Sequence, residues 1–149
     1  MTHTRRFFFA PLLALILLTA CSGLAQSSVF YHKWPLCGNY VVQMGLGDGF
    51  IATTDGTPVV KSQVGYLYFD TQYIFATRHE KDENDSQSIY ELWAIEISSG
   101  EVTGPMTMDE FNASYPTYAI GSNPEWVFAG SYSAIRDRWE ELNPGQSYE

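Results

Sequence analysis

The sequence predicts an α+β fold: an antiparallel β-sheet built from hairpins, with one short helix and a C-terminal amphipathic helix packed on it. Two observations carry this prediction. Between residues 40 and 97, runs rich in β-branched and aromatic residues alternate with turns rich in Gly, Asp and Asn. After residue 107 the apolar residues recur at helical spacing. We expect residues 30–149 to form a single domain.

The first half of this region predicts hairpins. Residues 40–46 and 50–54 read as strands around the turn at 47–49. Residues 66–69 and 73–79 read as a second pair around the turn at 70–72. The charged residues 80–88 predict a solvated loop.

Residues 89–97 predict the most apolar strand. Its Trp93, Ile95 and Ile97 share one face, and Leu92 and Ala94 share the other. A strand that is apolar on both faces is typical of the centre of a sheet covered on both sides. We therefore expect this strand to be buried between two layers.

Two helices are predicted after residue 107. Thr107, followed by Glu110 three residues later, is a capping box and predicts a short helix over 108–114, which Pro116 limits. A second helix is predicted over 132–142, ended by Pro144 and Gly145. Its apolar stripe should pack on the sheet, with Asp137, Glu140 and Glu141 facing water. That stripe consists of Tyr132, Ile135, Trp139 and Leu142.

The amino-terminal segment has the layout of an export signal. Arg5 and Arg6 precede an apolar run over residues 7–20 in which Thr19 is the only polar residue. A run of about 14 residues is shorter than the roughly 20 that span a bilayer. We therefore expect residues 1–20 to be a signal peptide that is removed on export.

Leu18, Thr19, Ala20 and Cys21 end this run and resemble the lipobox of bacterial lipoproteins. The resemblance implies cleavage between Ala20 and Cys21 and a diacylglyceryl group on the Cys21 sulfur. Each buried acyl CH₂ contributes about 0.8 kcal/mol, so two or three chains hold a protein stably on a membrane surface. An ordinary signal cut near Ala20 or Ala25 is the alternative.

The resemblance also bears on location. Ser22 stands where many lipoproteins retained in the inner membrane of Gram-negative cells have Asp, which favours the outer membrane, facing the periplasm. In a Gram-positive host the same anchor implies the outer face of the cell membrane. Residues 21–29 are small and polar and predict a flexible tether. Residues 4–8 also resemble part of a twin-arginine export motif, from which Phe9 and Ala10 depart, so the export route stays open.

The charge of the chain restricts its partners. The whole chain has 8 Lys and Arg against 17 Asp and Glu, and residues 1–20 contain two of the basic residues and none of the acidic ones. The mature chain would then carry a charge of about −11. This charge disfavours binding of nucleic acid and any additional electrostatic binding to anionic lipid. It suits a basic protein partner.

A resemblance to small bacterial lipoproteins of unknown function covers residues 90–111. It consists of a strand containing Trp-x-Ile-Glu, a Gly turn, Gly-Pro-Met-Thr and a short helix with a Phe. It implies a small lipoprotein domain and no activity. A similar sequence pattern occurs in β-propeller blades, but this chain is too short for the four or more blades that close a ring. The motif is carried by Tyr90, Trp93, Ile95, Glu96, Gly100, Gly104, Pro105, Met106, Thr107 and Phe111.

No motif predicts a catalytic residue, a metal site or a cofactor. The acidic loop at 82–85, with His32, His79 and Glu80, lacks the spacing of metal ligands. His79 is the better candidate for a Ser-His-Asp arrangement, and the many acids allow carboxylate pairs without singling one out. A small envelope hydrolase that uses His79 or a carboxylate pair is the alternative function.

Cys37 has no intrachain partner once Cys21 is lipidated. We expect it to be a buried small hydrophobe, with a thiol open to another chain as the alternative.

Aromatic residues are numerous, and all ten tyrosines follow residue 20. Rigid amphipathic rings suit recognition of a protein or a glycan, although paired strands use the same residues across a sheet. The loop-rich residues 114–128 are the expected binding surface, with Tyr115, Tyr118 and Trp126 as candidate residues. The function predicted from sequence is a membrane-anchored envelope lipoprotein that binds another protein without catalysis, as an immunity-type factor or an assembly accessory.

Overall fold

The computed structural model describes residues 32–45, 49–61, 63–81, 88–119 and 125–148. All of them belong to the compact unit Tyr31–Glu149. The expected signal peptide, the lipidation site at Cys21 and the tether lie outside the described residues. The same holds for the acidic residues at 82–85.

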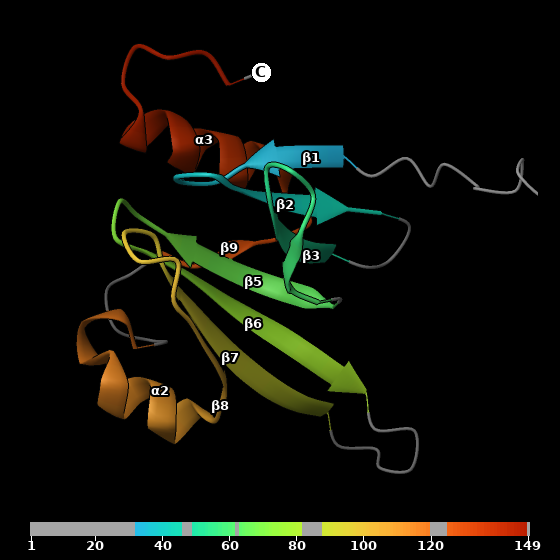
Figure 1. Ribbon diagram of the computed structural model, residues 1–149, viewed down its shortest axis with the longest axis vertical. Coiled ribbons are helices and arrows are strands. Elements are labelled where there is room, and N and C mark those ends of the chain that lie inside the picture. The colour runs from blue at the N-terminus through green and yellow to red at the C-terminus, as the bar shows by residue number, and fades with distance from the viewer. Residues whose placement is uncertain (1–31, 46–48, 62, 82–87, 120–124, 149) are drawn as a thin grey trace, which may run out of the picture. The chain divides into compact units, whose positions relative to one another are not determined.

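Within the described residues, nine strands form two antiparallel sheets (Figure 1). The four-stranded sheet has the order β1-β2-β3-β4, and the five-stranded sheet has the order β8-β7-β6-β5-β9. The first sheet consists of β1 (His32–Pro35), β2 (Tyr40–Met44), β3 (Gly49–Thr53) and β4 (Pro58–Val60). The second consists of β5 (Val64–Phe69), β6 (Tyr73–Lys81), β7 (Ser88–Glu96), β8 (Val102–Met106) and β9 (Val127–Phe128).

The α+β class is confirmed, and both predicted helices have the predicted bounds. Helix α2 (Met108–Ser114) begins at the capping box, in which the Thr107 side chain accepts from Glu110 N and Glu110 accepts from Thr107 N. Helix α3 is Tyr132–Leu142. A 3₁₀ turn, η1 (Pro116–Tyr118), follows α2. No helix among the described residues has the length and apolar character needed to cross a membrane.

Both predicted hairpins form, β2 with β3 and β5 with β6. In the second turn, Asp70 Oδ1 accepts from the backbone N–H of Gln72 at 2.7 Å and of Tyr73 at 2.8 Å, which fixes the reversal. The strands divide into two sheets where the prediction had one. The apolar inner face of β2 and β3 packs on the face of the β5–β7 sheet instead of pairing with its edge.

The two faces of the five-stranded sheet are covered by different layers. In Figure 1, α3 and β1–β3 lie above β5–β7, and α2 lies below them. We call the apolar cluster between this sheet and the layer of α3 and β1–β3 the upper core, and the cluster between the sheet and α2 the lower core. Ile95 of β7 packs into the upper core with Ile51 and Ile135, whereas Leu92 packs into the lower core with Phe111. The expectation that this strand is covered on both sides is confirmed from Leu92 to Ile95, whereas Tyr90 nearer its start is exposed.

The Gly104-Pro105 step lies inside strand β8. An edge strand tolerates Pro because its missing N–H faces outward. Gly104 has φ of +146°, and a Cβ there would lie 2.8 Å from the Trp93 ring. The close approach of β8 to Trp93 on β7 thus requires glycine at this position.

Candidate functional site

The structure brings Tyr115, Tyr118 and Trp126 together on one ring, that of Phe75. The centroid of the Phe75 ring lies 5.0 Å from that of Tyr115, 4.9 Å from that of Tyr118 and 6.4 Å from that of Trp126. Phe111 of α2 meets Phe75 edge to face at 5.1 Å. These are the separations of packed aromatic pairs. The expected binding residues therefore form the half-buried outer layer of the lower core.

Polar groups close one edge of this aromatic layer. The Tyr68 hydroxyl lies 3.4 Å from Asp70 Oδ2, and the Arg138 guanidinium lies 5.4 Å over the Tyr68 ring. Burial, together with the nearby Asp70 charge, raises the pKa of Tyr118 to about 12. The same two causes raise the pKa of Tyr68. Both phenols stay protonated at neutral pH and act as hydrogen-bond donors rather than nucleophiles.

The same face of the sheet continues beyond α2 and is open there. Along β6, Thr77 and His79 follow Phe75 at two-residue steps and so point to the same side. Across the sheet, Tyr66 pairs with Phe128, and His79 pairs with Tyr90. We call Tyr66, His79, Tyr90 and Phe128 the open aromatic strip.

The rings of the open aromatic strip contact one another in pairs. The centroids of Tyr66 and Phe128 are 5.8 Å apart, and those of His79 and Tyr90 are 5.2 Å apart. The exposed fractions of Tyr66, Phe128 and Tyr90 are 50%, 56% and 58%. Phe128 ends the segment 114–128 that the sequence predicted as a binding surface, whereas Tyr66 and Tyr90 were not assigned to one. The sequence signal for this face of the sheet is the two-residue spacing of Phe75, Thr77 and His79 along β6.

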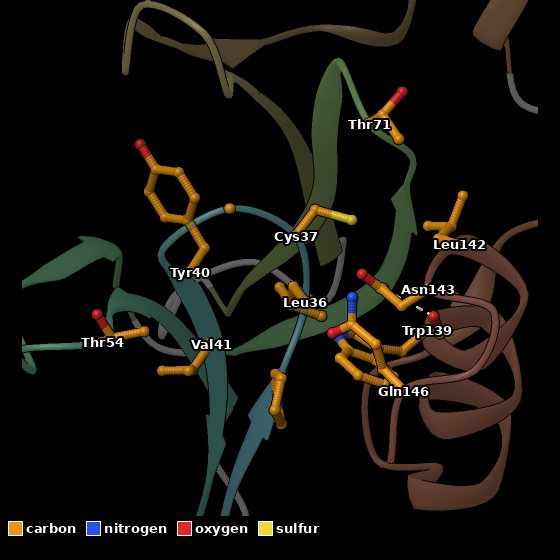
Figure 2. Close-up of a pocket in the computed structure, with 12 residues that line it drawn as sticks. Leu36, Cys37, Tyr40, Val41, Thr54, Thr71, Trp139, Leu142, Asn143 and Gln146 are labelled. Atoms are coloured by element: carbon orange, nitrogen blue, oxygen red, sulfur yellow. Dashed lines mark hydrogen bonds between the residues drawn. The ribbon is translucent and has the colours of Figure 1, made fainter. Parts of the chain in front are cut away.

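A separate cavity of about 420 Å³ lies in the upper layer, between the β1–β2 turn and the end of α3 (Figure 2). All of its described lining side chains are uncharged, although the protein is strongly acidic. The Trp139 indole and Leu36 give it an apolar wall, and the amides of Asn143 and Gln146 give it a polar one. Such a lining suits an uncharged group rather than an ion.

Cys37 lines this cavity, and Figure 2 shows its sulfur turned toward the space between Thr71 and the end of α3. The residue is buried and belongs to the upper core. Burial, reinforced by the Asp70 charge and opposed by Arg138, raises the pKa of the Cys37 thiol to about 11. A protonated, buried thiol behaves as a small hydrophobe, which is the first of the two readings of Cys37.

The two histidines among the described residues lie on different sheets. His32 on β1 lies beside Trp34, at 6.5 Å between ring centroids, and His79 on β6 lies beside Tyr90. Among the described residues, no three His, Cys, Asp or Glu side chains are close enough together to hold a metal ion. No ion pair between His79 and a carboxylate is found in the described part of the chain. The hydrolase alternative gains no support from this geometry.

Comparisons of the chain with protein-family models, with curated proteins and with solved structures found no match. The resemblance of residues 90–111 to small bacterial lipoproteins therefore stays a prediction.

Proposed function

We propose that this protein is a lipid-anchored lipoprotein of the bacterial cell envelope that acts by binding another protein and not by catalysis. The anchor is supported by one observation, the sequence Leu18-Thr19-Ala20-Cys21 at the end of an apolar run that follows Arg5 and Arg6. The lipid on Cys21 would hold the domain at a membrane surface without a spanning helix. In a Gram-negative cell this surface would be the outer membrane facing the periplasm, and in a Gram-positive cell the outer face of the cell membrane.

Two further observations support binding as the activity. The mature chain would carry a charge of about −11, which attracts basic proteins at long range. The described domain also leaves large aromatic side chains exposed, and such rings are enriched at protein interfaces. A basic toxin that must be neutralised, or a basic component of an envelope assembly, is the class of partner that fits these properties.

The anchor is tested by intact mass and membrane fractionation of the wild type, Cys21→Ser and a Ser22→Ala control, expressed with the full leader. We expect the wild type and Ser22→Ala to gain the mass of the lipid and to sediment with membranes. Cys21→Ser should lack that mass. A wild-type protein that is unmodified and remains in the soluble fraction would overturn the anchor.

The partner is tested by chemical crosslinking of the lipidated protein in its own cells, followed by mass spectrometry. We expect one basic protein to be captured repeatedly and to bind with micromolar or tighter affinity that weakens as salt is added. Capture of no basic protein, or an affinity that does not change with salt, would contradict this part of the proposal.

A further inference from the structure

The lower face of the five-stranded sheet carries aromatic rings toward both ends of β6, but only one of these ends is covered. Helix α2 has seven residues and is about 10 Å long. Strand β6 has nine residues and is about 30 Å long. The helix covers the part that carries Tyr73 and Phe75, and the part that carries His79 extends beyond it.

In the uncovered part, strand pairing fixes the backbone positions of the residues whose rings lie at the surface. Tyr66 is held by its backbone N–H, which donates to Thr77 Oγ1 at 2.9 Å, and by its pairing with Phe128 on β9. Tyr90 is held by pairing with His79 between the two longest strands. Each ring also contacts its cross-strand neighbour, Tyr66 with Phe128 and Tyr90 with His79, which reduces the side-chain entropy left to lose when a partner binds. Exposed rings gathered on one face in this way are typical of a docking surface.

Charge decides what kind of molecule this surface fits. A second copy of the chain would bring the same charge of about −11 and would be repelled. The faces of aromatic rings attract guanidinium and ammonium groups. After its pairing with β7 at Leu92, strand β8 leads into the first turn of α2, which carries Asp109 and Glu110.

The domain already contains the contact that a basic partner would make. The guanidinium of Arg138 lies 5.4 Å over the centroid of the Tyr68 ring, and that of Arg136 lies 5.8 Å over the Tyr132 ring. Tyr68 is on the same strand as Tyr66, two residues further along, and therefore on the same face.

From this geometry we infer that the open aromatic strip is the surface on which the partner docks, through Arg or Lys side chains that lie over the exposed rings of Tyr66, Tyr90 and Phe128. The inference rests on the proposed function, because it names the surface and the recognised chemistry of the same basic partner.

The test uses a synthetic peptide of six Arg residues separated by Gly as the probe and isothermal titration calorimetry as the measurement. The double variant Tyr66→Leu with Phe128→Leu keeps the apolar area and removes the rings. We expect its affinity for the peptide to fall by about fivefold or more. Tyr66→Phe keeps the ring and should bind as the wild type does. Tyr132→Leu removes an exposed ring on α3 and should also bind as the wild type does.

Two further measurements keep the inference open to refutation. Tyr90→Leu removes the ring at the other end of the strip, on a central strand, and should by itself weaken binding of the Arg peptide. This single variant serves as the test if the double variant fails to fold. Equal affinity in the Leu variants and the wild type would overturn the inference. So would strip-dependent binding of a neutral chitin tetrasaccharide without binding of the Arg peptide, which would identify a glycan surface.

Crosslinking in cells separates this inference from the proposed function. If the wild type captures a basic partner and the Tyr66→Leu, Phe128→Leu variant captures it equally well, the partner docks elsewhere and only this inference fails. If the wild type captures no basic partner, the proposed function fails as well. Loss of the partner in the double variant and its retention in Tyr132→Leu is the outcome that we expect.

Discussion

Arg138 Nε on α3 donates a hydrogen bond of 3.1 Å to the carbonyl oxygen of Phe69, the last residue of β5. The same guanidinium donates to Glu141 Oε2 at 2.6 Å and lies over the ring of Tyr68. The Phe69 side chain points into the upper core, and the Tyr68 ring packs against the lower one. A single side chain therefore ties the C-terminal helix to β5, a strand of the sheet that separates the two cores.

This relationship predicts that Arg138→Met lowers the free energy of unfolding by about 1–3 kcal/mol, because a charged donor to a buried strand end is lost. Arg138→Lys keeps the charge but not the planar fork, so it should also be destabilising. Arg136→Met is the matched control, since Arg136 pairs with exposed acids on the same helix. Urea unfolding measures all three. Equal unfolding midpoints for Arg138→Met and Arg136→Met would contradict the role of Arg138.

Tyr115 and Tyr66 should respond very differently to truncation, although both are aromatic residues on the lower face. The Tyr115 ring packs on Phe75 at 5.0 Å and on Phe111 at 5.3 Å, between ring centroids. Tyr115→Ala should therefore cost about 2–4 kcal/mol of stability, and Tyr66→Ala about 1 kcal/mol or less. Denaturant unfolding of the two variants makes the comparison. Unchanged stability in Tyr115→Ala would show that this ring is not part of the core.

The elements that sequence predicted best are those with local signals. Helix α2 begins where Thr107 and Glu110 form the capping box, and α3 ends just before Pro144. The central position of β7 was also readable, because Leu92 and Ile95 are apolar on opposite faces of one strand. In each case the deciding residues lie within a few positions of one another.

The features that sequence reasoning missed depend on pairing between distant residues. Strand β9 has two residues, too few for any periodic pattern, and it is a strand because Val127 and Phe128 pair with β5. The division into two sheets likewise depends on which strands meet edge to edge. The rings of Tyr115 and Trp126 both pack near Phe75, and this orientation follows only from the packing of α2 and the following segment on the sheet.

The capping box should make the stability of α2 depend on pH. Glu110 Oε2 accepts from Thr107 N at 2.8 Å and from Thr107 Oγ1 at 2.9 Å, and these bonds lower the pKa of Glu110. A carboxyl with a lowered pKa in the folded state stabilises that state above its unfolded pKa of about 4.3. The contribution is lost as the pH falls through the folded pKa.

Thr107→Ala removes the cap and should cost about 1 kcal/mol at pH 7. The difference in unfolding midpoint between the wild type and this variant should be smaller at pH 3, where a larger fraction of Glu110 is protonated than at pH 7. Ser114→Ala, at the other end of α2, is the control and should show no such change between the two pH values. A difference that is as large at pH 3 as at pH 7 would mean that the Glu110 carboxylate does not contribute through the cap.

Cys37 should react slowly in the folded protein because the pKa of its thiol is raised. This cause can be distinguished from steric shielding of the sulfur. With the pKa of its thiol raised to about 11, little thiolate is present at pH 8. In a Cys21→Ser background, alkylation by iodoacetamide at pH 8 should be on the order of 100-fold slower in the folded than in the urea-unfolded protein. Mass spectrometry of timed samples gives both rates.

The dependence of the alkylation rate on pH distinguishes the two causes. If the raised pKa limits the reaction, the rate in the folded protein rises almost tenfold for each pH unit between 8 and 10. The unfolded protein has an ordinary thiol with a pKa of about 8.5, so its rate levels off above pH 9. A folded protein whose rate also levels off near pH 9 would show that Cys37 has an ordinary pKa. Shielding of its sulfur by the walls of the cavity would then be the whole cause of its slow reaction.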